Sequence, residues 1–137
     1  MRVMVTGSRG WTDRGRIREA FGKVVAGRVV LVHGDCRGAD RLAAEVALEL
    51  GWDVVPRAAD WEGPCAAGCP PGHRRARGGQ TSGATYCPNA GRRRNQEMVD
   101  ARPDVVFAFP TARSVGTWDA VRRARRAGIR VEVASVA

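Results

Sequence analysis

The chain has 137 residues, about the size of one ordinary domain, with 44% apolar residues and a formal net charge of +9. This composition excludes wholesale disorder, and no apolar run reaches the roughly 20 residues that a membrane-spanning helix needs. The basic residues are nearly all arginine, since Lys23 is the single lysine. Arginine donates two parallel hydrogen bonds to a phosphate, so this charge favours a phosphate-bearing partner. GC-rich coding is the alternative explanation for scattered surface arginines.

Strands and helices alternate along the chain. Short apolar runs rich in β-branched residues predict five strands, at residues 3–6, 28–33, 52–56, 104–109 and 130–133. Apolar residues at helical spacing predict four helices, at residues 13–25, 39–50, 92–99 and 117–127. This order is typical of a parallel sheet with helices on both faces. We expect one Rossmann-like, three-layer α/β domain over residues 1–137, with a mostly parallel five-stranded sheet.

The chain begins with a short β-branched run that ends in a glycine turn. A secretory signal would instead show a charged segment followed by a longer apolar one. We therefore expect a cytoplasmic protein without a membrane partner. Thiols stay reduced in that compartment, so the four cysteines indicate metal binding before they indicate disulfides.

Residues 61–91, called the insert below, interrupt the alternating pattern. They are rich in Gly, Pro, Arg and Cys, and a structureless stretch of this length is uncommon in a compact domain. Four candidate metal ligands with the spacing C-x3-C-x3-H-x13-C fall in it: Cys65, Cys69, His73 and Cys87. Three thiolates and one imidazole are typical of structural zinc, which can replace a hydrophobic core. The alternative is an ill-ordered loop with free cysteines.

The insert and the residues just after it are strongly basic. Six arginines oppose Glu62: Arg74, Arg75, Arg77, Arg92, Arg93 and Arg94. A patch of this kind beside a pocket suits a polyphosphate tail or nonspecific contact with nucleic acid. Trp61 and Tyr86 flank the patch, and we expect them to pack against the insert. Stacking on a nucleobase is the alternative.

Glycine-bearing turns follow the first, second and fourth predicted strands, at residues 7–10, 34–40 and 116–117. Ligands of α/β sheets bind at the carboxyl ends of strands, where helix N-termini offer free N–H groups to phosphate. Neither GxGxxG nor GK[ST] is present, which excludes the two commonest glycine-loop signatures. We predict a nucleotide-type ligand with Arg9 at the mouth of its pocket. Asp40 either binds a ribose hydroxyl or serves as the first-turn acid of its helix.

Four stretches together resemble the SLOG superfamily of Rossmann-like nucleotide-binding proteins: MRVMVTGSR, HGDCRGAD, Arg94-Asn95 with Met98, and Gly116-Thr117. The resemblance is closest to the small single-domain YAcAr-type branch, common in actinobacteria and their phages, and covers nearly the whole chain apart from the insert. The superfamily includes the LOG phosphoribohydrolases and DNA-processing protein A. The resemblance implies a protein that senses or processes a nucleotide-derived ligand, such as a phosphoribosyl or ADP-ribose-like molecule. The ligand contacts implied are Gly7, Ser8, Arg9, Gly34, Gly38, Asp40, Arg94, Asn95, Gly116 and Thr117.

One departure from the family pattern bears on catalysis. The LOG hydrolases carry a catalytic Glu after Pro-Gly-Gly-x-Gly-Thr, and the matching position here is Ala120. Asp119 is adjacent but points about 100° away on a helix. We therefore expect binding without turnover. The alternatives are cleavage of an N-glycosidic bond, with Asp40 or Asp119 as the acid/base, and nonspecific nucleic-acid binding. Relatives often pair through helices beside the pocket, which leaves a homo-oligomer open.

Overall fold

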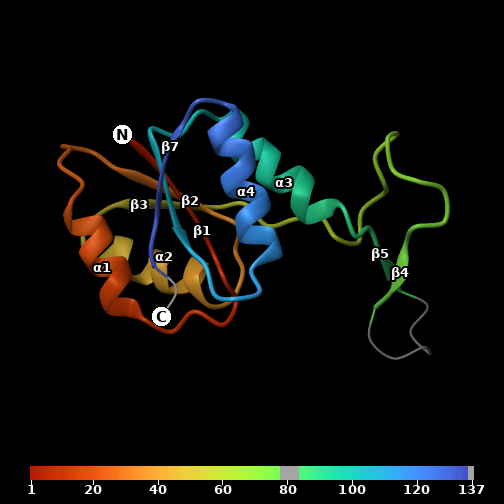
Figure 1. Cartoon of the computed structure of the whole chain (residues 1–137), viewed down its shortest axis with the longest axis horizontal. Helices are drawn as coiled ribbons and strands as arrows, with labels where there is room; N and C mark the ends of the chain where they lie inside the picture. The colour runs from red at the N-terminus through yellow and green to blue at the C-terminus, as the bar shows by residue number, and fades with distance from the viewer. Residues whose placement is uncertain (78–83, 136–137) are drawn as a thin grey trace.

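A computed structural model describes residues 1–77 and 84–135. At its centre is a five-stranded parallel sheet with the strand order β3-β2-β1-β6-β7 (Figure 1). The strands are β1 (Arg2–Gly7), β2 (Val30–His33), β3 (Asp53–Pro56), β6 (Val105–Phe109) and β7 (Arg130–Val133). The predicted three-layer α/β fold is confirmed. The chain order reverses between β1 and β6, which is where such sheets bind ligands.

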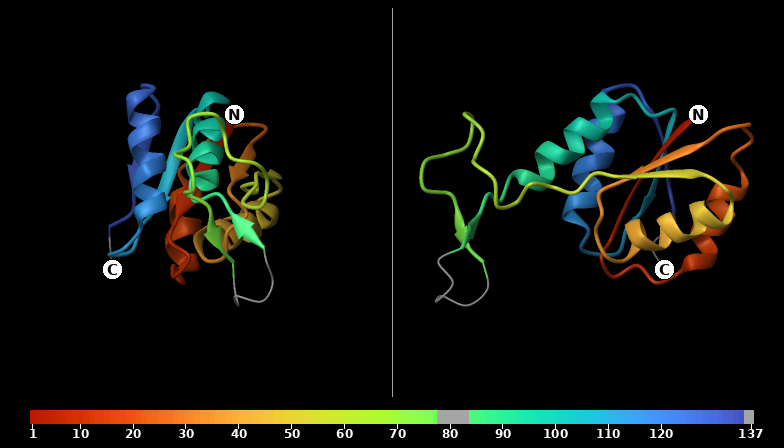
Figure 2. Two further views of the ribbon diagram at one scale, coloured as in Figure 1. Left: turned by 90° about the vertical axis from the view of Figure 1, so that its right-hand side faces the viewer. Right: turned by 180° about the vertical axis from the view of Figure 1, so that it is seen from behind.

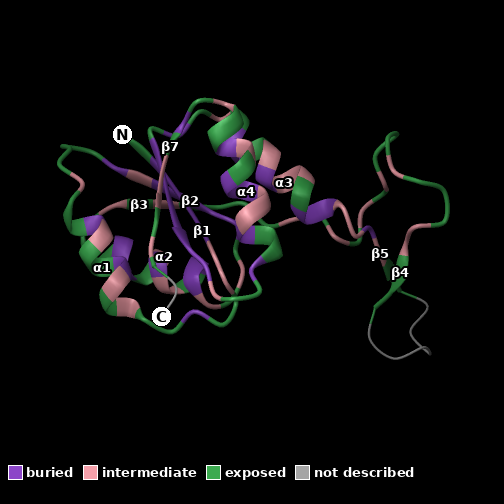
Figure 3. Ribbon diagram, viewed as in Figure 1, coloured by how far each residue is buried: buried purple, intermediate pink, exposed green. Residues whose placement is uncertain are grey.

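Two pairs of helices cover the two faces of the sheet. The first pair is α1 (Arg14–Gly22) and α2 (Ala39–Glu49), and the second is α3 (Ala90–Asp100) and α4 (Val115–Arg126). Each pair contributes apolar side chains to a separate core, with the sheet between them. Figure 3 shows buried residues along the central strands and on the helices. Among the described residues, no helix combines the length and apolarity needed to cross a membrane.

The helix boundaries follow the sequence closely. The carboxylate of Asp13 accepts a hydrogen bond from the Arg16 N–H at 3.1 Å, which caps α1. The helix ends at Gly22, before the predicted Val25, which is 94% exposed. Helix α3 begins two residues before the predicted Arg92. These differences are of the size that helix ends commonly show.

The insert has more regular structure than the sequence indicated. A short antiparallel hairpin joins β4 (Arg75–Ala76) to β5 (Thr85–Tyr86). Residues 78–83 of the predicted insert lie outside the described residues. The hairpin stands clear of the sheet, beyond the N-terminal end of α3 (Figures 1 and 2). Most of its described residues are exposed or half-buried, as expected where apolar periodicity is lacking.

The turn that follows β1 packs directly on the N-terminus of α2. The Ala39 N–H donates to the Ser8 carbonyl at 3.1 Å. Gly38 has φ +79°, and a Cβ atom there would lie 2.5 Å from the Ser8 carbonyl oxygen. Only glycine satisfies both the backbone angle and this close approach. The contact holds the first two glycine turns together at the carboxyl ends of β1 and β2.

We predict that Gly38→Ala lowers the free energy of unfolding by about 3 kcal/mol or more, because it combines backbone strain with a steric clash. Gly51→Ala is a matched control: Gly51 has φ +77°, but no atom of the described residues lies within 4 Å of a Cβ atom there. The control should cost about 1–2 kcal/mol from backbone strain alone. Urea denaturation of both variants measures the difference, and equal losses would contradict the proposed close approach.

Candidate functional site

A cavity of about 390 Å³ lies at the carboxyl ends of the strands, bordered by α3, α4 and the base of the insert. This volume is within the range of small-molecule pockets. Nine of the ten predicted ligand residues line it: Gly7, Ser8, Arg9, Gly34, Asp40, Arg94, Asn95, Gly116 and Thr117. Gly38 is not among the lining residues, because it packs behind the cavity against the backbone of Ser8 and Arg9.

Several lining residues were not predicted from the sequence. Arg113 and Ser114 belong to the connection between β6 and α4, and Trp61 and Pro88 come from the two ends of the insert. The position of Arg113 just after a predicted strand was the available signal. For Trp61, the sequence left stacking on a nucleobase open as an alternative to packing against the insert, but it did not place the side chain at the cavity.

The N-terminus of α4 is open to the cavity. Ser114 occupies the N-cap position, but its side chain makes no cap hydrogen bond to the helix. Its hydroxyl instead accepts a hydrogen bond from the Thr111 N–H at 2.7 Å. Val115, Gly116 and Thr117, which form the first turn, all line the cavity. First-turn N–H groups and the positive end of the helix dipole are thus available to an anion.

The arginines around the cavity fall into two kinds. Within the described part of the chain, the exposed guanidiniums of Arg9 and Arg113 have no hydrogen-bond or ion-pair partner. The guanidinium of Arg94 is already hydrogen-bonded within the protein: it donates to the carbonyl oxygens of Gly34 at 2.6 Å and Arg57 at 3.2 Å. Arg94 therefore fixes the backbone that follows β2 and β3, whereas Arg9 and Arg113 are free to bind a ligand.

Asn95 joins α3 to α4 across the cavity wall. Its amide donates to the Gly116 carbonyl at 3.3 Å and to Asp119 Oδ2 at 3.1 Å, and its own oxygen accepts from Arg94. Arg123 also donates to Asp119 Oδ2, at 2.9 Å. Partial burial opposes the ionisation of Asp119, but the hydrogen bonds from Arg123 and Asn95 hold the pKa of this carboxyl below its ordinary value. Asp119 is therefore a paired carboxylate and is poorly suited to donate a proton.

The position that matches the LOG glutamate has a different environment from its neighbour. Ala120 is completely buried in the core between α4 and the sheet. Asp119 lines the cavity, as expected for an adjacent residue turned by about 100° on the helix.

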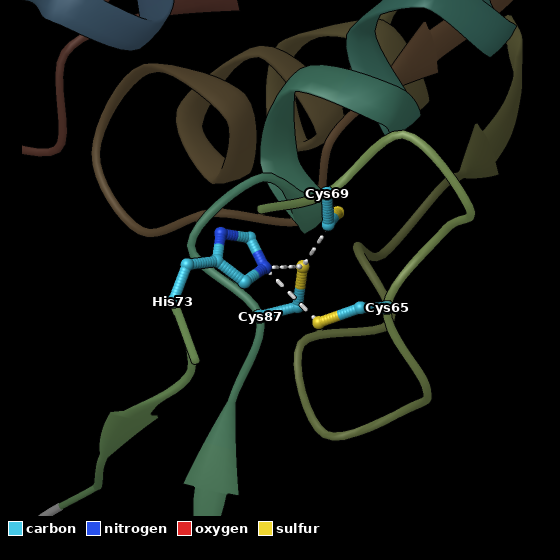
Figure 4. A group of neighbouring side chains, drawn as sticks. All are labelled: Cys65, Cys69, His73 and Cys87. Carbon is cyan, nitrogen blue, oxygen red and sulfur yellow. Dashed lines mark hydrogen bonds between the residues drawn. The ribbon is translucent and has the colours of Figure 1, made fainter. Parts of the chain in front are cut away.

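The four candidate metal ligands of the insert gather at one point (Figure 4). Their ligand atoms all lie within 4.8 Å of one another. The Sγ atoms of Cys69 and Cys87 are 3.8 Å apart, and Cys65 Sγ is 3.0 Å from His73 Nε2. All four thiols of the chain, including that of Cys36, are free. Three sulfur atoms and one imidazole nitrogen at these separations form a site that can bind a metal ion.

Hydrogen-bond donors surround the cysteine cluster. Arg93 donates to the sulfur atoms of Cys69 at 3.4 Å and Cys87 at 3.3 Å, and Arg74 donates to Cys65 at 3.6 Å. Burial opposes ionisation of Cys87, but the hydrogen bonds from Arg93 and nearby groups lower the pKa of this thiol to about 6. A thiolate is the form that ligates metals, so these contacts prepare the cluster for an ion.

Asp40 has a buried carboxylate, only 4% exposed. Its Oδ2 atom accepts hydrogen bonds from the backbone N–H groups of Gly34 at 3.0 Å and Cys36 at 3.3 Å, which shape the turn after β2. Its Oδ1 atom has no hydrogen-bond partner among the described residues. Burial raises the pKa of Asp40 to about 6, against the lowering effect of these hydrogen bonds.

The raised pKa of Asp40 predicts a pH-dependent stability. Between about pH 4 and pH 6 the folded state binds more protons at this group than the unfolded state, so its contribution to stability falls as pH rises. We expect the stability of the native protein relative to Asp40→Asn to fall by about 1–3 kcal/mol from pH 4 to pH 7. Urea denaturation across this range gives the difference, and a difference that does not change with pH would contradict the assignment.

Comparison with known proteins agrees with this architecture. The profile of the YAcAr family, described as "YspA, cpYpsA-related SLOG family", matches residues 1–63. The Gene 61 protein of Mycobacterium phage D29 is 37% identical over 138 residues, which cover 95% of this chain and 93% of the relative. The profile match includes the turns after β1 and β2, and the phage relative extends the similarity over the insert, α3 and α4. The chain therefore belongs to the YspA, cpYpsA-related SLOG family.

Proposed function

We propose that the cavity binds a nucleotide or nucleotide-derived small molecule, and that the protein acts as a sensor of it. The observation that carries the proposal is the uncapped first turn of α4, which borders the same cavity as Arg9 and Arg113. Backbone N–H groups, a helix dipole and two guanidiniums that have no partner among the described residues form a suitable site for a phosphate. Membership of the SLOG family also suggests a nucleotide-related ligand.

In this proposal, some of the other predicted ligand residues contact the ligand, and others hold the cavity walls in place. Gly7, Ser8 and Thr117 line the cavity, where their small side chains leave room for a ligand. Arg94 and Asn95 hold the walls in place through bonds to Gly34 and Gly116. In this proposal, Arg94 and Asn95 keep the residues that contact the ligand in position.

Hydrolysis of the ligand is the second candidate function, and Asp40 is its best acid/base candidate. Its pKa near 6 favours proton transfer close to neutral pH, whereas Asp119 is already paired with Arg123. The buried Oδ1 atom, which lacks a partner among the described residues, is also suited to accept a hydrogen bond from a ribose hydroxyl. We favour binding without turnover, because the LOG glutamate position is the buried Ala120.

We expect AMP to raise the melting temperature of the protein without release of adenine. Arg113→Ala should weaken AMP binding about 10-fold or more, because a charged hydrogen bond to phosphate is lost. Arg126→Ala is the matched control: it removes the same charge from the last turn of α4 and should leave the affinity unchanged. Calorimetric titration measures affinity, and liquid chromatography measures adenine.

The outcomes separate the two functions. Adenine release that Asp40→Asn abolishes would replace the sensor with a hydrolase. No stabilisation of the native protein by AMP, ADP or ADP-ribose would contradict the proposed ligand class.

The ion suited to the cysteine cluster is zinc in a structural role. A tetrahedral zinc site with Zn–S bonds of about 2.3 Å places sulfur atoms roughly 3.8 Å apart. The Cys69–Cys87 separation of 3.8 Å fits this geometry. The described part of the insert has few buried side chains, so a metal would supply the stability that a core supplies elsewhere.

Freshly purified, reduced protein should contain about one equivalent of zinc by elemental analysis. Cys69→Ser should lose the metal, whereas the control Cys36→Ser should retain it, because Cys36 lies outside the cluster. Protein purified without metal, or equal metal content in the two variants, would contradict the site. A homo-oligomer, cytoplasmic location, a single domain over residues 1–137 and nonspecific nucleic-acid binding stay predictions from the sequence.

A further inference from the structure

Trp61 forms one wall of the cavity. It is half-buried, and it lies next to the first turn of α3. A Cβ atom on Gly91 would come within 2.9 Å of the indole ring. Gly91 has ordinary helical geometry, so its backbone conformation does not require glycine. The missing side chain therefore serves to let the aromatic ring lie flush against the helix.

The protein holds the Trp61 ring in place from several sides. Tyr86 meets it edge-on, with ring centroids 6.0 Å apart and planes at 78°. The Arg77 guanidinium lies over the Tyr86 ring, 5.2 Å from its centroid. The Trp61 carbonyl accepts a hydrogen bond of 2.8 Å from the N–H of Cys87, one of the four clustered ligands. The expected packing of Trp61 and Tyr86 is thus present, and it orients Trp61 toward the cavity.

Trp61 and the open end of α4 are separated along α3. Gly91, which contacts Trp61, is four residues before Asn95, and this corresponds to a rise of about 6 Å. The Asn95 amide bonds to the Gly116 carbonyl in the first turn of α4. The cavity therefore has an aromatic end and an anion-binding end, offset along α3 by about one helical turn.

We propose that Trp61 stacks on an aromatic base of the ligand, which makes the ligand a nucleoside phosphate and excludes a plain sugar phosphate. This inference rests on the proposed function and names the class of ligand at the same site. Every nucleobase presents an aromatic face, so one tryptophan serves recognition of the class. The ring is fixed before the ligand arrives, so little conformational entropy is lost on binding.

The test compares AMP with ribose 5-phosphate, which has the same sugar and phosphate but no base. Trp61→Ala should weaken AMP binding about 5- to 150-fold and leave ribose 5-phosphate binding unchanged. Trp118→Ala is the matched control, because Trp118 is also half-buried but does not line the cavity, and it should bind both as the native protein does. Calorimetric titration gives the affinities.

A second variant, Trp61→Phe, tests the same inference if Trp61→Ala does not fold. Trp61→Phe keeps an aromatic face and should still bind AMP. AMP should quench tryptophan fluorescence in the native protein but not in Trp61→Phe, because Trp11, Trp52 and Trp118 do not line the cavity.

Each result has a distinct meaning. If the native protein binds both compounds and Trp61→Ala weakens both equally or neither, the stacking inference is overturned while the proposed function stands. Retained quenching in Trp61→Phe overturns it as well. If the native protein binds neither compound, the proposed function fails, and this inference fails with it.

Discussion

The site depends on the close approach of two backbones, where the turn after β1 meets the start of α2. The Ala39 N–H bonds to the Ser8 carbonyl, and Gly38 makes room for this contact. One first-turn N–H of α2 is therefore already bonded to a protein carbonyl. In α4, the Ser114 hydroxyl accepts from the Thr111 N–H instead of capping the helix, and Val115, Gly116 and Thr117 of the first turn all line the cavity. The strand order brings both helix ends to one edge of the sheet.

Helix α3 connects the ligand cavity to the cysteine cluster. Neighbouring residues at its start face different ways: Arg93 donates to cluster sulfur atoms, whereas Arg92 and Arg94 line the cavity. The backbone bond between Cys87 and Trp61 forms a second connection. The insert places an aromatic wall at the mouth of the cavity, next to four side chains that can bind a metal ion.

The sequence predicts the sheet, its four helices and the clustering of Cys65, Cys69, His73 and Cys87, because buried parallel strands are continuous apolar runs and metal ligands have a recognisable chemistry. The sequence alone could not distinguish the cavity residues that are free to bind a ligand from those that are bonded to the protein and hold the cavity walls. Asn95 has its amide bonded to Gly116 and Asp119, and only three-dimensional structure reveals such pairing. The hairpin of the insert was also missed, since strands of two residues have no detectable period.

A crystal structure of the protein grown with AMP tests the central claim most directly. We expect electron density for the phosphate at the N–H groups of Val115, Gly116 and Thr117, within reach of Arg113, and for the adenine against the Trp61 ring. Density for AMP at another surface, or an empty cavity at saturating AMP, would contradict it.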